Sequence, residues 1–562
     1  MQLSDDFLKT LSSSLDQITE SIQPIFNDLK SLSKQLVTIT HITQLKEIAE
    51  NFCPAVKNIK LTLHKFKHFR RQLTKFLKNE EQNFQVSQTS LKIKKVKEKK
   101  HILNQLNKYK SSAKAIEPPS KLSIQDDAFI INNNLDDNLI SNANFTSEMK
   151  AQLNENEGLN DVKDPISLLT HISCYVCKKK SRTLHFFYDQ MCYDCGLFNY
   201  HKRLQTCDLS GKYALLTGAR VKIGYQIALI LMRNGCNLIA TTRFPKDALN
   251  RFSQEKDFNV WKERLMIYGL DLRNLSSIKN FCEELTNTLP QLDIVINNAA
   301  QTNRHHPLFY KNLAAIENSE INDNFKNIIQ EKFPCAYPEI KLFAIENSPS
   351  DFKMKQFDQL TYEKTENNDQ TISNPFDPVF TKYFPDNCFD INNQQIELTT
   401  KNSWVKTFSE VSLPEFAEAQ VINSWAPYLL CFYLRPILAL NPSDNKHIIN
   451  VSSMEGRFNK FKNIFHPHTN MAKASLDMLT RTCAKDFKEN NIFMNSVDTG
   501  WVSEMLPMEQ IRKRTVPLDE LDGAMRVLDP VFSGLSGKER AYGRFFKDYK
   551  SIPLVEMDVM RE

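Results

Sequence analysis

Two Cys-x-x-Cys pairs lie close together in the stretch CYVCKKKSRTLHFFYDQMCYDC. The first pair is Cys174 and Cys177, and the second is Cys192 and Cys195. Two such turns can direct four thiolates toward one tetrahedral Zn²⁺ ion. We expect this zinc to be structural, because four protein ligands leave no open coordination position. The alternative is a group of four unrelated, reduced thiols.

The turn TGARVKIG at residues 217–224 is a second candidate site. It joins an apolar segment to an amphipathic one, and a second apolar segment follows Gly235. This order of strand, turn, helix and strand is typical of a βαβ unit. In such a unit the turn leads into a helix N-terminus, where backbone N–H groups can bind phosphate.

This turn resembles the phosphate loop TGxxxGxG of the short-chain dehydrogenase/reductase family. Lys222 stands where the family has its middle glycine. That change matters little if the backbone of Lys222 stays at negative φ, and a lysine there could attract phosphate. The resemblance implies that the loop holds the cofactor through Thr217, Gly218, Arg220, Lys222, Ile223 and Gly224.

Further motifs follow in the order that the family has. Arg243 stands where an NAD-dependent member usually has an acidic residue, and a guanidinium suits the 2′-phosphate of NADP. The stretch YGLDLRN resembles the adenine-binding segment, which implies that Asp271 and Leu272 contact the cofactor. The stretch LDIVINNAAQT is similar to the family's NNAG motif and adds Asn297 and Ala299.

The catalytic residues of the family are matched except for one. Asn423, Ser453 and Lys473 match its asparagine, serine and lysine, which implies that they hold a relay water, the substrate carbonyl and the nicotinamide ribose. The family's tyrosine, which acts as the acid, falls at Thr469. A threonine hydroxyl is too weak an acid for that role, and general acid–base help contributes about a hundred- to ten-thousand-fold in rate. The segment around Gly500 resembles the one that closes over the nicotinamide.

The missing tyrosine leaves several interpretations open. His468 or His466 could replace it, because imidazole titrates near neutral pH, although a structural role is the more common one for a histidine. We expect a divergent NADP-dependent oxidoreductase acting on a carbonyl or alcohol. The alternative is a pseudoenzyme that binds nucleotide as a structural or sensing subunit of a larger assembly. A third possibility makes the N-terminal region the functional end of the chain.

These sites need particular elements to position them. The resemblance implies an α/β fold over residues 208–562, with a Rossmann-type, doubly wound parallel sheet. An insertion at about 303–416 interrupts it, and long insertions usually form a lid, a substrate shelf or a partner surface. We expect a small zinc module at residues 166–207.

The N-terminal fifth of the chain has a different character. Apolar residues between Leu8 and Leu36, and again between Leu45 and Phe76, recur at spacings that predict helices. Residues 1–115 are therefore expected to be all-α and coiled-coil-like, forming either an intramolecular hairpin or a contact with a protein partner or a second copy. The lysines of residues 92–100 could meet an acidic partner or an anionic membrane, or form a solvated helix face. Residues 116–165 are rich in Asn and Asp, which predicts a disordered or loose linker.

Length, net charge and cysteine count limit the kinds of protein that this sequence can encode. The 562 residues suffice for two or three domains, and the net charge of +6 is too small to indicate specific nucleic-acid binding. The sequence has neither an apolar run long enough for a transmembrane segment nor a signal-peptide pattern at its start. The expected location is cytoplasmic. The 12 cysteines agree with a reducing compartment if four of them bind metal.

Overall fold

The computed structural model describes residues 89–112, 165–320, 325, 327–330, 382–508, 515–537 and 540–552. The chain divides into two compact units. Of the first, residues 1–88 and 166–172, only 166–172 are described, and they belong to strand β1 (Ile166–Ser173). The second unit, residues 89–165 and 173–562, contains the elements discussed below. The helices predicted before residue 89 and nearly all of the predicted linker lie outside the described residues.

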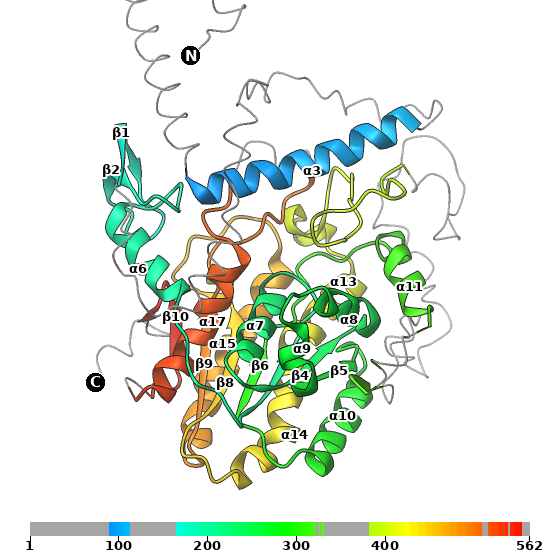
Figure 1. Ribbon diagram of the computed structural model, residues 1–562, viewed down its shortest axis with the longest axis vertical. Coiled ribbons are helices and arrows are strands. Elements are labelled where there is room, and N and C mark those ends of the chain that lie inside the picture. The colour runs from blue at the N-terminus through cyan, green and yellow to red at the C-terminus, as the bar shows by residue number, and fades with distance from the viewer. Residues whose placement is uncertain are drawn as a thin grey trace, which may run out of the picture. The chain divides into compact units, whose positions relative to one another are not determined.

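A nine-stranded sheet lies at the centre of the second unit (Figure 1). Its strand order is β11-β10-β9-β8-β6-β3-β4-β5-β7, and β10 and β11 form the antiparallel pair beside otherwise parallel neighbours. The predicted doubly wound parallel sheet is confirmed. The strands are β3 (Tyr213–Thr217), β4 (Asn237–Thr242), β5 (Leu265–Gly269), β6 (Ile294–Asn297), β7 (Ile329–Gln330), β8 (Lys446–Ser452), β9 (Ile492–Asp498), β10 (Phe545–Lys547) and β11 (Lys550–Ile552).

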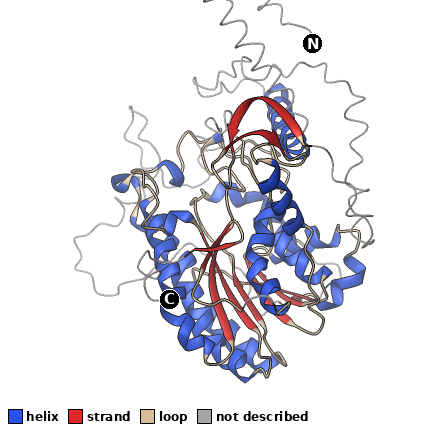
Figure 2. Cartoon of the chain, turned by 90° about the vertical axis from the view of Figure 1, so that its left-hand side faces the viewer, coloured by secondary structure: helices blue, strands red, loops and turns tan. Residues whose placement is uncertain are grey.

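Helices cover both faces of this sheet, as Figure 2 shows. Side chains alternate between the faces along a strand, so Ala214 and Leu216 of β3 join one apolar core and Leu215 joins the other. Burial on both faces explains why the strands are almost continuously apolar. The first core is covered by α7 (Lys222–Arg233), α8 (Pro245–Ser253), α9 (Phe258–Trp261) and α17 (Glu520–Leu535). The second is covered by α10 (Leu275–Thr288), α14 (Ala426–Leu440) and α15 (Pro467–Lys488).

The strand order reverses between β3 and β6. Leu216 of β3 pairs with Ala240 of β4 on one side and with Ile296 of β6 on the other. From β3 the chain proceeds outward through β4 and β5, then returns to β6 and proceeds through β8 and β9. The helices on the two sides of such a reversal diverge, which leaves a crevice at the carboxyl ends of the strands. The fold therefore places its candidate site at the carboxyl ends of β3 and β6.

The predicted insertion contributes to the sheet itself. β7 lies within it, and Ile329 pairs with Ile267 of β5, so the insertion adds an edge strand. Part of the insertion thus extends the core, a role that the expected lid, shelf or partner surface did not include. Its other described elements are η3 (Pro307–Tyr310), α11 (Lys311–Glu317), η7 (Ser403–Val405), η8 (Phe408–Glu410) and part of α13 (Leu413–Gln420), and residues 331–381 lie outside the described residues.

The cysteine module, defined here as residues 173–203, packs beside α17 together with helix α3 (Ser90–Ser112) (Figure 1). The module contains β2 (Lys180–Leu184) and α6 (Tyr193–Arg203). Leu91 of α3 is buried in the same apolar cluster as Tyr188 of the module. The lysines of α3 meet acidic residues of the same chain, because Lys94 lies 3.2 Å from Asp519. Part of this lysine-rich stretch therefore pairs with acidic residues of the same chain.

Buried ion pairs attach the module to α17. The Arg203 guanidinium bonds to Asp519 at 2.6 Å and to Asp522 at 2.9 Å, and the Tyr188 hydroxyl donates to Asp522 at 2.7 Å. Burial alone would raise the pKa of Asp519, but Arg203 and Lys94 hold that pKa well below its usual range.

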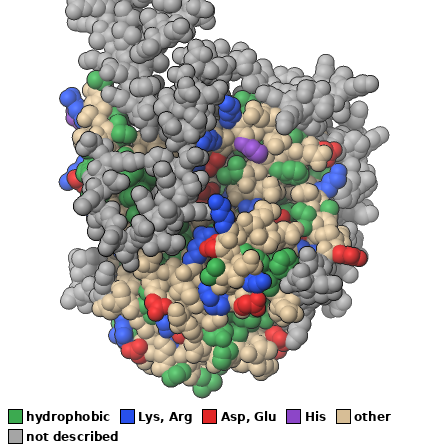
Figure 3. Space-filling view, in the orientation of Figure 1, with side chains coloured by type: hydrophobic (Ala, Val, Ile, Leu, Met, Phe, Trp, Pro, Cys, Tyr) green, Lys and Arg blue, Asp and Glu red, His purple; other side chains and the backbone are tan. Residues whose placement is uncertain are grey.

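Basic and acidic side chains also lie beside one another at several places on the surface drawn in Figure 3.

The described helices include none that is both long and apolar enough to cross a membrane. The remaining short elements are η2 (Lys262–Arg264), the π-helical turn η9 (Val421–Trp425) and η10 (Met454–Gly456).

Candidate functional site

The Thr217 hydroxyl joins the ends of the two central strands. It accepts hydrogen bonds from the backbone N–H groups of Asn298 and Ala299, both at 3.0 Å. The Asn298 side chain donates in return to the carbonyl oxygens of Thr217 at 3.0 Å and Gly218 at 3.2 Å. The TGARVKIG loop after β3 and the NNAA stretch after β6 are therefore one hydrogen-bonded unit at the strand reversal.

Two glycines of this loop are required by close packing. Gly218 has φ +71°, and a Cβ there would lie 2.9 Å from the Cα of Ala299. A Cβ on Gly224 would lie 2.0 Å from the carbonyl oxygen of Gly218. Any larger residue at either position would force the loop apart.

Lys222 departs from the sequence-based expectation. Its φ is +54°, in the left-handed region, whereas a harmless replacement of the family's glycine required a negative φ. A non-glycine residue pays about 1–2 kcal/mol in that conformation, because its Cβ approaches a carbonyl oxygen. The loop keeps the glycine-like backbone even though the glycine is absent.

The two other predicted loop residues face protein groups. Arg220 is buried and its guanidinium lies 2.7 Å from the Asp247 carboxylate, so its charge is compensated and adds less to the positive field than expected. Ile223 packs against the apolar cluster that includes Tyr188 of the cysteine module. Both side chains therefore contact the protein on the side of the loop that packs against α8 and the cysteine module.

Two arginines lie at the carboxyl ends of β4 and β5. The Arg243 guanidinium stacks over the Tyr310 ring, 4.8 Å from its centroid, and donates to the Tyr310 hydroxyl at 3.2 Å. Asp271 bonds to Arg273 at 2.6 Å, while Leu272 is buried. Burial alone would raise the pKa of Asp271, but Arg273 and, more weakly, Arg243 bring it below its usual value. Both guanidinium groups thus act on the Asp271 carboxylate, and Arg273 also lies 3.9 Å from the buried Glu418 carboxylate.

Asn297 belongs to a buried polar network. Its amide donates to Asn450 of β8 at 2.8 Å, and Asn450 donates to Thr480 of α15 at 2.9 Å. Thr480 shares a 2.8 Å hydrogen bond with Ser496 of β9. This network ties three strands and one helix together, and it gives the Asn297 amide a structural partner inside the sheet.

Asn423 lies in the π-helical turn η9, between α13 and α14. The side-chain oxygen of Asn423 accepts a hydrogen bond from the backbone N–H of Gln301 at 2.7 Å. The side-chain amide nitrogen of Asn423 donates to the backbone carbonyl of Gln301 at 2.9 Å. π-Helical turns are rare and occur frequently at functional sites. The turn fixes Asn423 against the chain that leaves β6.

Ser453 and Lys473 come from the loop after β8 and from α15. Ser453 begins η10, where its hydroxyl accepts from the backbone N–H of Glu455 at 3.1 Å. The Lys473 ammonium donates to the Val451 carbonyl of β8 at 2.8 Å. Burial lowers the pKa of Lys473 to about 8, with Asp477 opposing the shift, and burial raises the pKa of Asp477 to about 6. A buried, titratable pair therefore lies next to the end of β8.

Thr469 and His468 are both buried at the start of α15, with exposed fractions of 3% and 2%. Within the described part of the chain, neither Thr469 Oγ1 nor His468 Nδ1 has a hydrogen-bond partner. Burial lowers the pKa of His468, which keeps its imidazole neutral near pH 7. His466 is occupied instead: its ring stacks on Trp404 at 3.9 Å and its Nδ1 bonds to the Trp404 carbonyl at 2.8 Å. These contacts favour a structural role for His466.

Gly500 lies in the segment that follows β9. Its φ is +77°, and a Cβ there would lie 2.5 Å from the Leu518 side chain. The next backbone N–H, that of Trp501, donates to the Tyr175 hydroxyl of the cysteine module at 2.9 Å. Farther along, the Met505 carbonyl accepts from the Asn402 amide at 2.8 Å. The segment is thus held between the module and the insertion.

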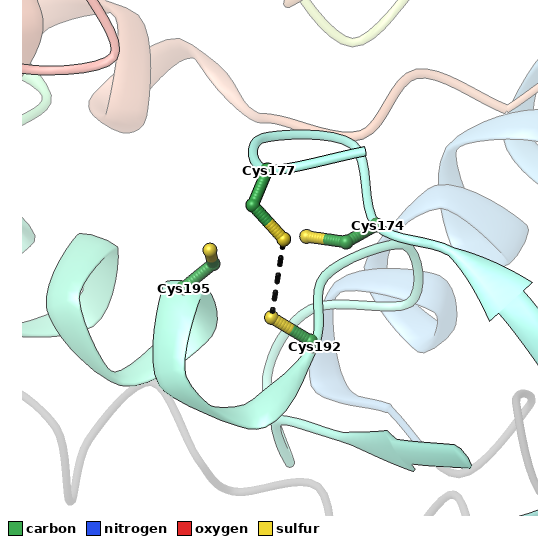
Figure 4. Close-up of side chains that lie close together, drawn as sticks. All are labelled: Cys174, Cys177, Cys192 and Cys195. Carbon is green, nitrogen blue, oxygen red and sulfur yellow. Dashed lines mark hydrogen bonds between the residues drawn. The ribbon is translucent and has the colours of Figure 1, made fainter. Parts of the chain in front are cut away.

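The four predicted metal ligands come together. Their Sγ atoms all lie within 4.8 Å of one another, and those of Cys177 and Cys192 are 3.9 Å apart. Figure 4 shows one pair on a loop and the other at the start of α6, with the sulfurs directed toward a common region. Zinc–sulfur bonds of about 2.3 Å in a tetrahedron separate the sulfurs by about 3.8 Å. The cluster therefore has the composition and size to hold a metal ion.

Sequence reasoning missed several residues that define this site. Arg273 stands two residues after the matched Asp271, but only the fold brings it near Arg243. Tyr175 lies between the first two cysteines, and nothing in its local sequence indicates a contact with Trp501. The contact of Gln301 with Asn423 likewise joins segments that are far apart in the chain.

The chain is similar in sequence to members of known families. A family model described as short chain dehydrogenase matches residues 212–330, and one described as Enoyl-(Acyl carrier protein) reductase matches residues 390–525. An uncharacterized protein of Acanthamoeba polyphaga mimivirus is 32% identical over 393 residues, which cover 67% of this chain and 74% of that protein. The WW domain-containing oxidoreductase of Drosophila melanogaster is 36% identical over 95 residues, or 16% of this chain and 23% of that one. The crystal structure of NADPH-bound carbonyl reductase from chicken fatty liver aligns with 61% of this chain and 99% of its own, at 17% identity and a TM-score of 0.37.

The strained loop residue gives a direct test. Lys222→Gly should raise the free energy of unfolding by about 0.5–1 kcal/mol, because relief of the left-handed strain exceeds the extra chain entropy of glycine. Lys222→Ala is the matched control, since it removes the same charge and keeps the strain. Denaturant unfolding of the full chain measures both variants. Equal stabilities of the glycine and alanine variants would contradict the strained backbone at Lys222.

Proposed function

This chain belongs to the short-chain dehydrogenase/reductase family, and we propose that it is an NADP-dependent oxidoreductase acting on a carbonyl or alcohol. The proposal rests on the positions of three side chains, which come from different elements and lie near the carboxyl ends of the central strands. Asn423 is anchored to the chain after β6, Ser453 follows β8, and Lys473 bonds to β8. These side chains lie beside the strand reversal, where doubly wound sheets bind their ligands.

The preference for NADP rests on charge. Arg243 and Arg273 lie near one another at the ends of β4 and β5, where both act on Asp271 and Arg273 also lies 3.9 Å from Glu418. A 2′-phosphate bound there would meet planar guanidinium donors, which suit phosphate geometry. Stacking over Tyr310 orients the Arg243 guanidinium. The remaining contacts would come from Thr217, Gly218, Lys222, Ile223, Gly224, Leu272, Asn297, Ala299, Lys473 and Gly500, with Arg220 supporting the loop. The bound nicotinamide would supply or accept the hydride.

The protein's own groups limit how a proton can move. Thr469 cannot supply one near neutral pH, since an aliphatic hydroxyl is far too weak an acid. The lowered pKa of His468 makes its imidazole a better base than acid at that pH. Lys473, with a pKa of about 8, is still mostly protonated at pH 7 and can hold a ribose hydroxyl without a tyrosine. A proton for reduction would then come from water ordered by Ser453 and Asn423, whereas the neutral His468 imidazole could accept a proton in the oxidative direction.

The metal is proposed to be a structural zinc ion. Four cysteine sulfurs around one centre match the ligand preference of zinc and leave no open position. Such a site would stabilise the module, because metal binding to a small domain contributes directly to its folding free energy.

Nucleotide selectivity tests the cofactor assignment. Wild-type protein should bind NADPH more tightly than NADH, and Arg243→Ala should weaken NADPH binding about 10- to 150-fold, as expected for a hydrogen bond to a charged group worth about 1.5–3 kcal/mol. NADH binding should change little. Arg540→Ala is the control, because Arg540 pairs with Asp444 at the surface. Equal affinities of wild-type protein for the two nucleotides in calorimetric titrations would count against NADP.

Turnover tests the proposed activity and the role of Thr469. With NADPH and a panel of carbonyl compounds, Thr469→Val should retain most of the wild-type rate, because the hydroxyl is not the acid. His468→Ala should slow the reaction only if the imidazole transfers the proton. A large loss of rate in Thr469→Val, with NADPH affinity intact, would refute the passive role of Thr469. Tight NADPH binding without any turnover in wild-type protein would instead support a nucleotide-binding pseudoenzyme.

Metal content tests the zinc assignment. Purified protein should contain about one zinc ion per chain, and Cys192→Ser should lose most of it, because three thiolates bind zinc more weakly than four. Cys207→Ser is the control, since Cys207 lies outside the cluster. Elemental analysis that finds no zinc in wild-type protein expressed in zinc-containing medium would contradict the assignment.

A further inference from the structure

We propose that the cysteine module positions the segment after β9 at the cofactor crevice, and that Tyr175 is the positioning residue. The inference rests on the proposed function for its consequence in nucleotide binding. The contacts that carry it lie within the second unit of the chain.

Tyr175 links the metal cluster directly to this segment. It stands between Cys174 and Cys177, so the turn that presents the sulfurs also sets the direction of the Tyr175 ring. Its backbone N–H donates to the Gln190 carbonyl at 2.7 Å, which ties the turn to the loop before the second cysteine pair. Its hydroxyl accepts from the Trp501 N–H at 2.9 Å. One hydroxyl thus satisfies a backbone donor in the segment that resembles the nicotinamide-closing one.

The module and the crevice also share an apolar cluster. Cys174 and Met191 of the module are buried with Val502 of the segment, and Ile223 of the phosphate loop packs against the same cluster. A Cβ on Gly523 would lie 3.0 Å from both Ile223 and Val502, so these two side chains approach the same point of α17. The loop after β3 and the segment after β9 therefore meet on a core that the module completes.

Polar contacts also join the module to residues 515–522, which follow the segment in the chain. The Gln190 amide donates to the Thr515 carbonyl at 2.9 Å, and Arg203 bonds to Asp519. Residues 498–502 and 515–522 are consequently both attached to the module. Residues anchored in this way have fewer conformations to lose when a ligand binds.

A thermodynamic consequence follows from this geometry. A metal ion at the cluster would order the module, because such binding contributes to folding. The module contacts Trp501, Val502 and Ile223 and would hold them in one arrangement. If that arrangement favours the dinucleotide, the dinucleotide must favour metal binding by the same factor. The module is then a conformational support for the crevice, although it lies outside the Rossmann-type sheet.

The test is Tyr175→Phe in the full, zinc-loaded chain, with Tyr193→Phe as the matched control. Both changes remove one hydroxyl from the module, and Tyr193 lies beside His185, with ring centroids 6.1 Å apart. Hydrogen exchange at the Trp501 amide and calorimetric titration with NADPH are measured on each. Tyr175→Phe should exchange Trp501 faster and bind NADPH about 2- to 10-fold more weakly, the scale of one hydrogen bond. Zinc content should stay at the wild-type level.

A second measurement checks the reciprocity. Competition with a zinc chelator should show tighter zinc binding when NADPH is present, and this gain should shrink in Tyr175→Phe. Unchanged Trp501 exchange in Tyr175→Phe would overturn the positioning role, whether or not NADPH binds. Faster exchange with unchanged NADPH affinity would overturn the link to the crevice. If wild-type protein binds no NADPH, the proposed function fails, while the Trp501 exchange still decides whether Tyr175 positions the segment.

Discussion

The candidate site depends on how the two central strands end. The strand order reverses between β3 and β6, and the backbone groups of the loops that follow these strands must find hydrogen-bond partners there. The Thr217 hydroxyl and the Asn298 amide meet this constraint with four hydrogen bonds. Gly218 and Gly224 allow the loops to approach, and Lys222 adopts the same backbone at an energetic cost.

The residues around the crevice are held by buried polar contacts that the rest of the sheet supplies. The network from Asn297 to Ser496 fixes β6, β8 and β9 relative to α15, and α15 carries Thr469 and Lys473. Buried Lys473 and Asp477 have pKa values shifted toward each other, to about 8 and about 6. Burial is the main cause of both shifts, because it disfavours the charged form of each group.

The sequence predicted the parts of the structure that local patterns and family motifs encode. The α/β class follows from the apolar segments and the parallel sheet from the family resemblance, while the four-cysteine cluster follows from the spacing of the cysteines. The edge strand β7 could not be predicted, because two residues of strand inside a polar insertion carry no periodic signal. The positive φ of Lys222, the pairing of Arg273 and the contact of Tyr175 arise from tertiary packing. The role of residues 1–88 remains a prediction.

The long sequence separation between the cysteine module and its docking surface has a consequence for biosynthesis. Tyr188 and its partner Asp522 are 334 residues apart. At about 5–20 residues per second, the ribosome delivers that partner roughly 20–70 s after the module has emerged. During this interval the apolar cluster of Phe187 and Met191 lacks Val502 and Leu518, although Leu91 of the earlier helix α3 is already present. A metal ion bound at the four-cysteine cluster would stabilise the module before these partners are synthesised.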